Sequence, residues 1–198
     1  MYFLVLLVVF QLSFVSFKVV GLPDVPNIDP DGNAFVSAFT QEVKSSSVLS
    51  ELFDMKGNSG EGLGQYIYND ARKNLQSFGV EDAENAAAYA TQHLSQDFPV
   101  LTFDTLVKVF GTIMARYLSS EGILNEGNSQ TLAMEYAKSF EDSANSNMNS
   151  QVGSKFIAIG QGFVPFVTSI VQMTPEKGNK IATYFGDAWK LEAASRSA

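Results

Sequence analysis

His93 is the only histidine in the chain, and it is the one side chain that could act as a conventional base near neutral pH. Asp97 follows four residues later, a spacing that would place both side chains on one face of a helix. A hydrolytic centre would also need an activated nucleophile, and the chain has no G-x-S-x-G motif. We therefore interpret His93 as a surface or boundary residue. A pH-sensitive pair of His93 with Asp97 is the alternative.

Two other motifs contain residues that could do chemistry. The adjacent carboxylates of Glu81–Asp82 and Glu141–Asp142 would not face each other on a helix, so we interpret them as solvated helix positions rather than as acid–base pairs. The segment Gly160-Gln-Gly162 lacks the third glycine, the preceding strand and the lysine of nucleotide-binding loops. It is more typical of close helix packing or of a hinge.

The sequence contains no motif for metal binding or thiol chemistry. The chain contains no cysteine, which excludes disulfide scaffolds, thiol catalysis and thiolate metal sites. It also has no H-x-x-x-H or H-E-x-x-H motif that could bring several ligands to one metal ion. We expect no catalytic residue, no metal and no cofactor, and we expect that the protein is not an enzyme.

Residues 1–21 are predicted to be a secretory signal peptide. Met1 to Phe17 carries no charge, and Lys18 interrupts the run shortly before the small residue Gly21. The alternative is a membrane anchor, but the apolar run is shorter than the roughly 20 residues that span a bilayer. Cleavage after Ser16 and cleavage after Gly21 are both compatible with the pattern. The mature protein is then expected to be secreted and extracellular.

The charge of the chain restricts its partners. The sequence has 13 basic and 21 acidic residues, a net charge of −8, and its calculated pI is about 4.6. Nucleic-acid binding depends on neutralising phosphates with Lys and Arg, so this balance argues against a nucleic-acid partner. It also argues against an anionic membrane surface, and we expect no membrane contact after signal removal. At neutral pH, the negative charge favours solubility through mutual repulsion.

The rest of the chain predicts a single all-α domain. Residues 22–32 hold three prolines and three aspartates, which predicts an extended leader, with Asp31 or Asn33 capping the first helix. Residues 33–195 then show apolar residues at helical spacing and no strand alternation of any length. We expect one globular bundle of about six to eight helices without a sheet.

Glycine, threonine and proline predict several helix boundaries. Gly79 and Gly122 are expected to end helices, and Thr102 and Thr174-Pro175 to start them. Asp142 to Gln151 is rich in serine and asparagine, so we expect a frayed end or a loop there.

The segment Gly153–Met173 differs from the others because it has almost no polar face. A helix that is apolar all round is either central in the core or covered by a partner. We expect a kink or a break at Pro165, which removes one backbone hydrogen bond. The residues that form the candidate core or self-association segment are Phe156, Ile159, Phe163, Phe166, Val167 and Ile170.

Five stretches follow one another in an order that matches a known family. They are Gly64-Gln-Tyr-Ile-Tyr-Asn-Asp-Ala-Arg-Lys-Asn-Leu75, the turn Phe78-Gly79-Val80, the run Ala86-Ala-Ala-Tyr-Ala90, the turn Gly122-Ile123-Leu124-Asn125, and Leu132-Ala133 at a helix start. Together they resemble the repeat domain of tubuliform spidroin, the egg-case silk of spiders, most clearly over residues 64–146. The family repeat is richer in serine and alanine and has fewer charges than these helices.

The resemblance implies a compact, non-enzymatic bundle that is soluble in the gland and built into egg-case fibre. Its implied partners are copies of itself or other silk proteins. On this basis we expect a secreted structural or accessory silk protein that self-associates, and more strongly as acidification from pH 7 toward 5 removes the charge repulsion. The alternative is a secreted all-helical carrier of small apolar ligands, in which the many Phe and Met residues could line a pocket.

Overall fold

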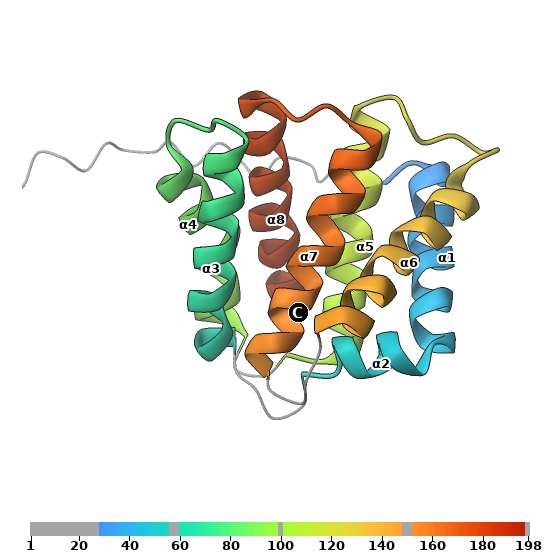
Figure 1. Ribbon diagram of the computed structural model, residues 1–198, viewed down its shortest axis with the longest axis horizontal. Coiled ribbons are helices and arrows are strands. Elements are labelled where there is room, and N and C mark those ends of the chain that lie inside the picture. Colours follow the sequence, from blue (N-terminus) through green and yellow to red (C-terminus); the bar gives the residue numbers. More distant parts are fainter. Residues whose placement is uncertain (1–27, 56–59, 99–100, 148–151, 197–198) are drawn as a thin grey trace, which may run out of the picture.

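The computed structural model describes residues 28–55, 60–98, 101–147 and 152–196. Within these ranges the chain forms eight α-helices and no strand, so the prediction of an all-α bundle of six to eight helices is confirmed (Figure 1). The expected signal peptide and residues 22–27 of the expected leader lie outside the described residues. The helices are α1 (Pro30–Ser45), α2 (Ser47–Phe53), α3 (Gly60–Ser77), α4 (Ala83–Asp97), α5 (Phe103–Ser120), α6 (Ser129–Asn147), α7 (Val152–Ile170) and α8 (Pro175–Arg196).

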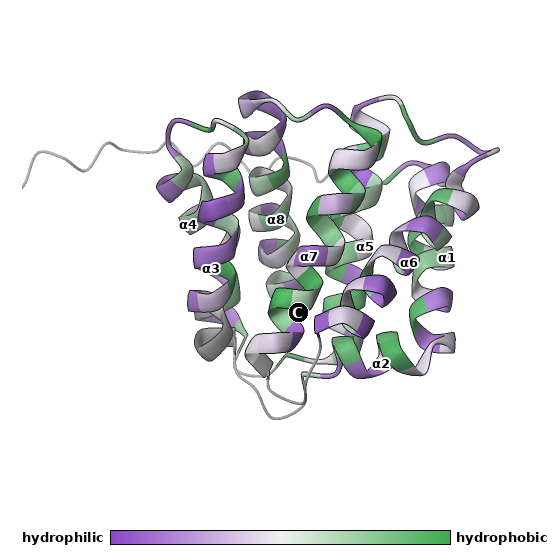
Figure 2. Cartoon of the chain, in the orientation of Figure 1, coloured by the Kyte–Doolittle hydropathy of each residue, from purple (hydrophilic) through white to green (hydrophobic). Residues whose placement is uncertain are grey.

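The helices divide into two groups that meet along α7 and α8. Helices α1, α2, α5 and α6 pack together on one side of the molecule, and α7 packs mainly on α6. Helices α3 and α4 form a pair on the other side, and α8 lies between α4 and α5 (Figure 1). Hydropathy follows this arrangement, with hydrophilic residues along the outer side of α3 and hydrophobic ones on α7 (Figure 2).

Helix α1 begins at Pro30, three residues earlier than the sequence predicts. The Asp29 side chain accepts a hydrogen bond from the amide of Gly32 at 2.6 Å. Pro30 occupies the first helical position, where its missing N–H costs nothing. The extended leader therefore does not reach residue 32, and neither Asp31 nor Asn33 is the cap, because Asp29 and Pro30 already provide a complete helix start.

The other predicted boundaries are confirmed at the residues that control them. Gly79 and Gly122 both adopt a positive φ, of 79° and 68°, which an L side chain rarely tolerates. The Thr102 side chain accepts from the amide of Thr105, at the start of α5. The Thr174 hydroxyl accepts from the amide of Lys177, at the start of α8.

The frayed end or loop predicted for Asp142 to Gln151 is wrong as far as Asn147, because α6 continues to that residue. Contact with α7 stabilises this last part of the helix, although its serines and asparagines favour a loop. The Ser143 hydroxyl donates to the Ala158 carbonyl of α7 at 2.7 Å, and the Ala144 side chain is buried. Residues 148–151 lie outside the described residues.

Pro165 does not break α7, which is continuous from Val152 to Ile170. The kink, the other outcome expected at Pro165, stays a prediction. Pro165 lacks the N–H that would bond to the carbonyl of Gln161, but both residues lie on the exposed face of the helix. Water can therefore reach the freed carbonyl. The Thr168 hydroxyl donates to the carbonyls of Val164 and Pro165 and adds local support.

The larger group of helices shares a core of aromatic rings. Tyr136 of α6 lies at its centre, with ring centroids 4.8 Å from Phe39, 4.7 Å from Phe140 and 4.9 Å from Phe166. Its hydroxyl donates to the Phe110 carbonyl at 3.4 Å, and complete burial raises the pKa of Tyr136 well above the usual value. Phe140 also packs edge-to-face with Phe53 and Phe110, so aromatic rings fill this side of the bundle.

The α3–α4 pair has a separate and much smaller apolar cluster. Its buried members are mostly alanines and short side chains, which let α3, α4 and α8 approach closely: Leu75, Val80, Ala83, Ala87, Ala90 and Ala182. Tyr89 of α4 adds a polar link by donating to the Asp187 carboxylate of α8 at 2.7 Å. Between this alanine cluster and the aromatic core lies the seam of α3 with α7.

Candidate ligand-binding cavity

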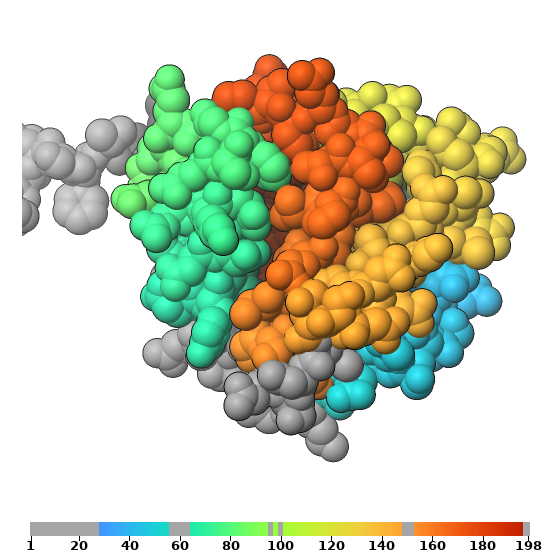
Figure 3. Space-filling view, viewed as in Figure 1, coloured from blue at the N-terminus to red at the C-terminus, as the bar shows by residue number. Residues whose placement is uncertain are grey.

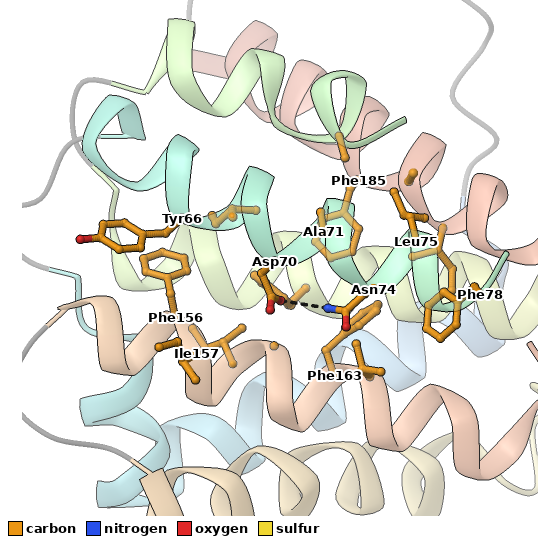
Figure 4. A pocket seen from close by; sticks show the side chains of 18 residues that line it. Tyr66, Asp70, Ala71, Asn74, Leu75, Phe78, Phe156, Ile157, Phe163 and Phe185 are labelled. Atoms are coloured by element: carbon orange, nitrogen blue, oxygen red, sulfur yellow. Dashed lines mark hydrogen bonds between the residues drawn. The ribbon is translucent and has the colours of Figure 1, made fainter. Parts of the chain in front are cut away.

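A cavity of about 130 Å³ lies in the seam between α3 and α7. Helices α3 and α7 form its two walls, and side chains of α4, α5 and α8 close its inner end. The surface of the molecule is hollowed along this line (Figure 3). The lining is almost entirely apolar and includes Ile67, Ala71, Leu75, Phe78, Phe156, Ile159, Phe163, Val164, Ile181, Ala182 and Phe185 (Figure 4).

The cavity exists because α7 packs tightly on α6 and much less on α3. A Cβ placed on Gly162 would lie 2.8 Å from the Cα of Phe140, so the two backbones touch at this point. On the α3 side, the glycines described in α7 meet only side-chain atoms, those of Tyr66 at Gly153 and of Asp70 at Gly160. The α3 helix packs instead on the alanine-rich face of α4, which leaves space on the α7 side.

Gly160 lies on the side of α7 that faces α3. A Cβ at this position would be 2.5 Å from Oδ2 of Asp70, so the missing side chain makes room for the Asp70 carboxylate. The two glycines of the Gly160-Gln-Gly162 segment therefore have different neighbours. Gly162 meets backbone, and Gly160 meets the far end of a polar side chain.

Asp70 is the one acidic residue that lines the cavity. It lies at the mouth, in contact with solvent, and Asn74 donates to its Oδ2 at 3.1 Å (Figure 4). Burial of the carboxyl raises the pKa of Asp70, against the opposing effects of the Lys73 charge and the Asn74 hydrogen bond. An apolar environment at this position thus disfavours an unpaired negative charge.

Three phenylalanines connect the inner part of the cavity to the aromatic core. Phe185 of α8 lies 5.5 Å from Phe110 and 5.3 Å from Phe163, measured between ring centroids, and both pairs are edge-to-face. All three residues line the cavity. A flat apolar group that entered the cavity would therefore meet aromatic rings.

Two exposed hydrophobic side chains flank the mouth. Tyr66 of α3 is 56% exposed, and Ile157 of α7 is 53% exposed. They belong to the four large hydrophobic side chains that are exposed among the described residues, the others being Tyr89 and Met134. Exposed apolar groups that gather at the edge of a cavity are typical of binding sites.

The structure places the predicted His93–Asp97 pair on α4, outside the cavity lining. His93 Nδ1 and Asp97 Oδ2 are 2.7 Å apart, as their four-residue spacing allows, and both side chains are partly exposed. The pH sensitivity of this pair stays a prediction.

The candidate segment on α7 is largely interior. Phe156, Ile159, Phe163, Phe166 and Val167 are buried, and Ile170 is half-buried. Of these six residues, Phe156, Ile159 and Phe163 also line the cavity. The sequence does not identify the α3 wall or Asp70 as partners of this segment. The one signal that could have pointed there is Gly160, a small residue in an otherwise bulky helix.

Two other features, a metal site and a membrane-spanning helix, were searched for among the described residues. No group of three or more His, Cys, Asp or Glu side chains there is arranged to hold a metal ion. None of the helices in those ranges combines the length and the apolar character needed to cross a bilayer.

Comparison with known proteins finds no match among family models, curated proteins or solved structures.

Proposed function

We propose that this protein is a secreted binder of small apolar molecules, which it holds in the cavity between α3 and α7. The single observation that carries the proposal is a cavity of about 130 Å³ with apolar walls and two exposed hydrophobic side chains at its mouth. The uncharged apolar segment at the N-terminus supports secretion. Because side chains of five helices line the cavity, the folded domain can hold the molecule without an enclosing partner.

The size of the cavity limits the ligand. An apolar cavity of about 150 Å³ is large enough to bind benzene, and it stays free of water when nothing polar lines it. The cavity here is of that order, so it suits a single ring or a branched chain of similar volume. A larger molecule could extend past the mouth, where Tyr66 and Ile157 offer apolar surface.

Titration with toluene tests the proposal. We expect saturable binding of one toluene per chain by calorimetry, and a melting temperature that rises with toluene concentration, because a ligand that binds only the folded state stabilises it. Ala71→Leu adds a side chain to the α3 wall and should abolish both effects. Ala194→Leu makes the same change on the exposed surface of α8 and serves as the control.

Two results would contradict the proposal. One is toluene uptake that rises linearly with concentration and never saturates, which indicates partition into loose surfaces. The other is equal binding by Ala71→Leu and Ala194→Leu when both variants keep the helical circular-dichroism spectrum of the wild type.

The tubuliform resemblance supports a second candidate, a silk component that associates with copies of itself. The observation that favours it is the acidic balance of the chain, with a net charge of −8 and a pI of about 4.6, which would let acidification promote association. The contact would need a surface other than the buried side of α7. Light scattering that rises between pH 7 and 5 at low salt is the expected result, and flat scattering would contradict it.

A further inference from the structure

We propose that the cavity selects apolar molecules that carry a hydrogen-bond donor, either a hydroxyl or an ammonium group. The acceptor that recognises this donor is the carboxylate of Asp70. The inference rests on the proposed function, since it describes the chemistry of the same site. It follows from the position of one carboxylate in a lining that is otherwise mostly apolar.

The Asp70 carboxylate has acceptor capacity that the protein leaves unused. Its Oδ2 accepts from Asn74 at 3.1 Å, and its Oδ1 has no hydrogen-bond partner among the described residues. Both oxygens lie beside the bare Cα of Gly160, with Oδ2 the nearer. A carboxylate has about four lone-pair sites, so a donor at the mouth could bond to Asp70 without displacing Asn74.

The surroundings of Asp70 favour a donor over other polar groups. Burial already disfavours the negative charge of this carboxyl, and a donor group, above all a cationic one, would compensate for it. A carboxylate ligand would instead place a second negative charge beside the first. Among the residues that line the cavity, the other side chains with polar atoms are Asn74 and Tyr66, and neither carries a positive charge. Lys73 is not part of this lining, although its charge acts on the Asp70 carboxyl.

Gly160 acts as a positioning residue in this arrangement. Its missing Cβ lets the carboxylate lie against the backbone of α7, where it faces the cavity mouth instead of turning fully to solvent. Any side chain at this position would push the carboxylate away. The apolar part of the same molecule would then contact Phe163 and Phe185 farther in.

Four probes with the same ring separate the ligand classes: toluene, benzyl alcohol, benzylamine and benzoate. For the wild-type protein we expect calorimetry to show benzylamine binding about tenfold more tightly than toluene, since hydrogen bonds to charged groups are the strong ones. Benzyl alcohol should fall between the two, and benzoate should bind most weakly. The relative affinities of the alcohol and the amine show which donor the site prefers.

Two variants assign the preference to Asp70. Asp70→Ala should lose the preference for benzylamine and benzyl alcohol over toluene, because the acceptor is gone. Gly160→Ala should weaken the preference without changing the charge of the protein. Glu135→Ala removes one exposed carboxylate from α6 and should behave like the wild type. The preference is measured in each variant as the ratio of the affinity for the donor probe to the affinity for toluene in that same variant.

The outcomes separate the two proposals. Toluene that binds as tightly as benzylamine and benzyl alcohol would overturn the inference and leave the proposed function standing. Retention of the full donor preference in Asp70→Ala or in Gly160→Ala would also overturn it, and so would tightest binding of benzoate. Failure of all four probes to bind would instead overturn the proposed function, and the inference with it.

Discussion

The two sides of α7 differ in how they pack, which assigns stability to one side and the proposed binding to the other. Toward α6, Gly162 brings two backbones into contact beside the rings of Tyr136 and Phe140. Toward α3, Gly160 makes room only for the end of the Asp70 side chain, and a cavity remains. Dense aromatic packing on one side holds α7 in place. The other side can therefore stay open for a ligand without loss of the fold.

The largest expected contrast between the two sides comes from truncating one apolar side chain on each. Phe140→Ala removes a fully buried ring and should lower the free energy of unfolding by about 3–5 kcal/mol. Ile157→Ala, at the exposed mouth, should change it by less than about 0.5 kcal/mol. Denaturant unfolding followed by circular dichroism measures both. Similar losses in the two variants would contradict the division of α7 into a stabilising and a binding side.

The glycine pair gives a sharper test because the two substitutions are chemically identical. Gly162→Ala drives a Cβ into the Phe140 backbone and should cost about 1–3 kcal/mol of stability. Gly160→Ala displaces only the end of Asp70 and should be neutral or stabilising by up to about 1 kcal/mol, because alanine favours the helix. Urea denaturation of the two variants provides the comparison. An equal or reversed order would show that the α3 side is as tightly packed as the α6 side.

Two carboxylates should respond to pH with opposite sign. Glu121, at the end of α5, accepts from Lys180 at 2.8 Å and forms an ion pair with Lys177 at 3.1 Å. These lysines lower the pKa of Glu121, with Lys180 contributing most, so its stabilising effect is present above pH 4.5 and is lost as the pH falls through the folded pKa. Burial raises the pKa of Asp70, so its charged form weakens the fold as the pH rises from 3.8 through the folded pKa.

Single substitutions isolate the two effects. Glu121→Gln should be less stable than the wild type at pH 7, by about 1 kcal/mol for a partly exposed charge pair, and the difference should shrink on acidification. Asp70→Asn should be slightly more stable than the wild type at pH 7, and this gain should disappear below pH 3.8. Thermal unfolding between pH 3 and 7 gives both curves. Parallel curves for the two variants would contradict the assignment.

Helices and their ends could be predicted from the sequence because the responsible interactions are local. Apolar spacing, the positive φ of Gly79 and Gly122, and the Thr102 cap all act within a few residues. The error at the end of α6 and the absence of a break at Pro165 depend on how these helices are placed in the fold. Contact with α7 keeps the last part of α6 helical despite its serines and asparagines, and solvent exposure makes Pro165 harmless within α7.

The cavity could not be predicted in the same way. It depends on the distance between α3 and α7, which three other helices separate along the chain. The apolar pattern of α7 does not show which of its sides meets α6 and which meets α3. Gly160 and Asp70 become neighbours only when both helices are placed in the fold. No sequence motif around Asp70 therefore marks it as part of the site.

NMR with bound toluene tests most directly whether small apolar molecules occupy the seam between α3 and α7. With methyl-labelled protein, we expect intermolecular NOEs from the toluene ring to the methyl groups of Leu75, Val164 and Ile181, which line the cavity from three helices. Ligand NOEs that reach only exposed groups such as Met134, or no NOEs at saturating toluene, would contradict the account.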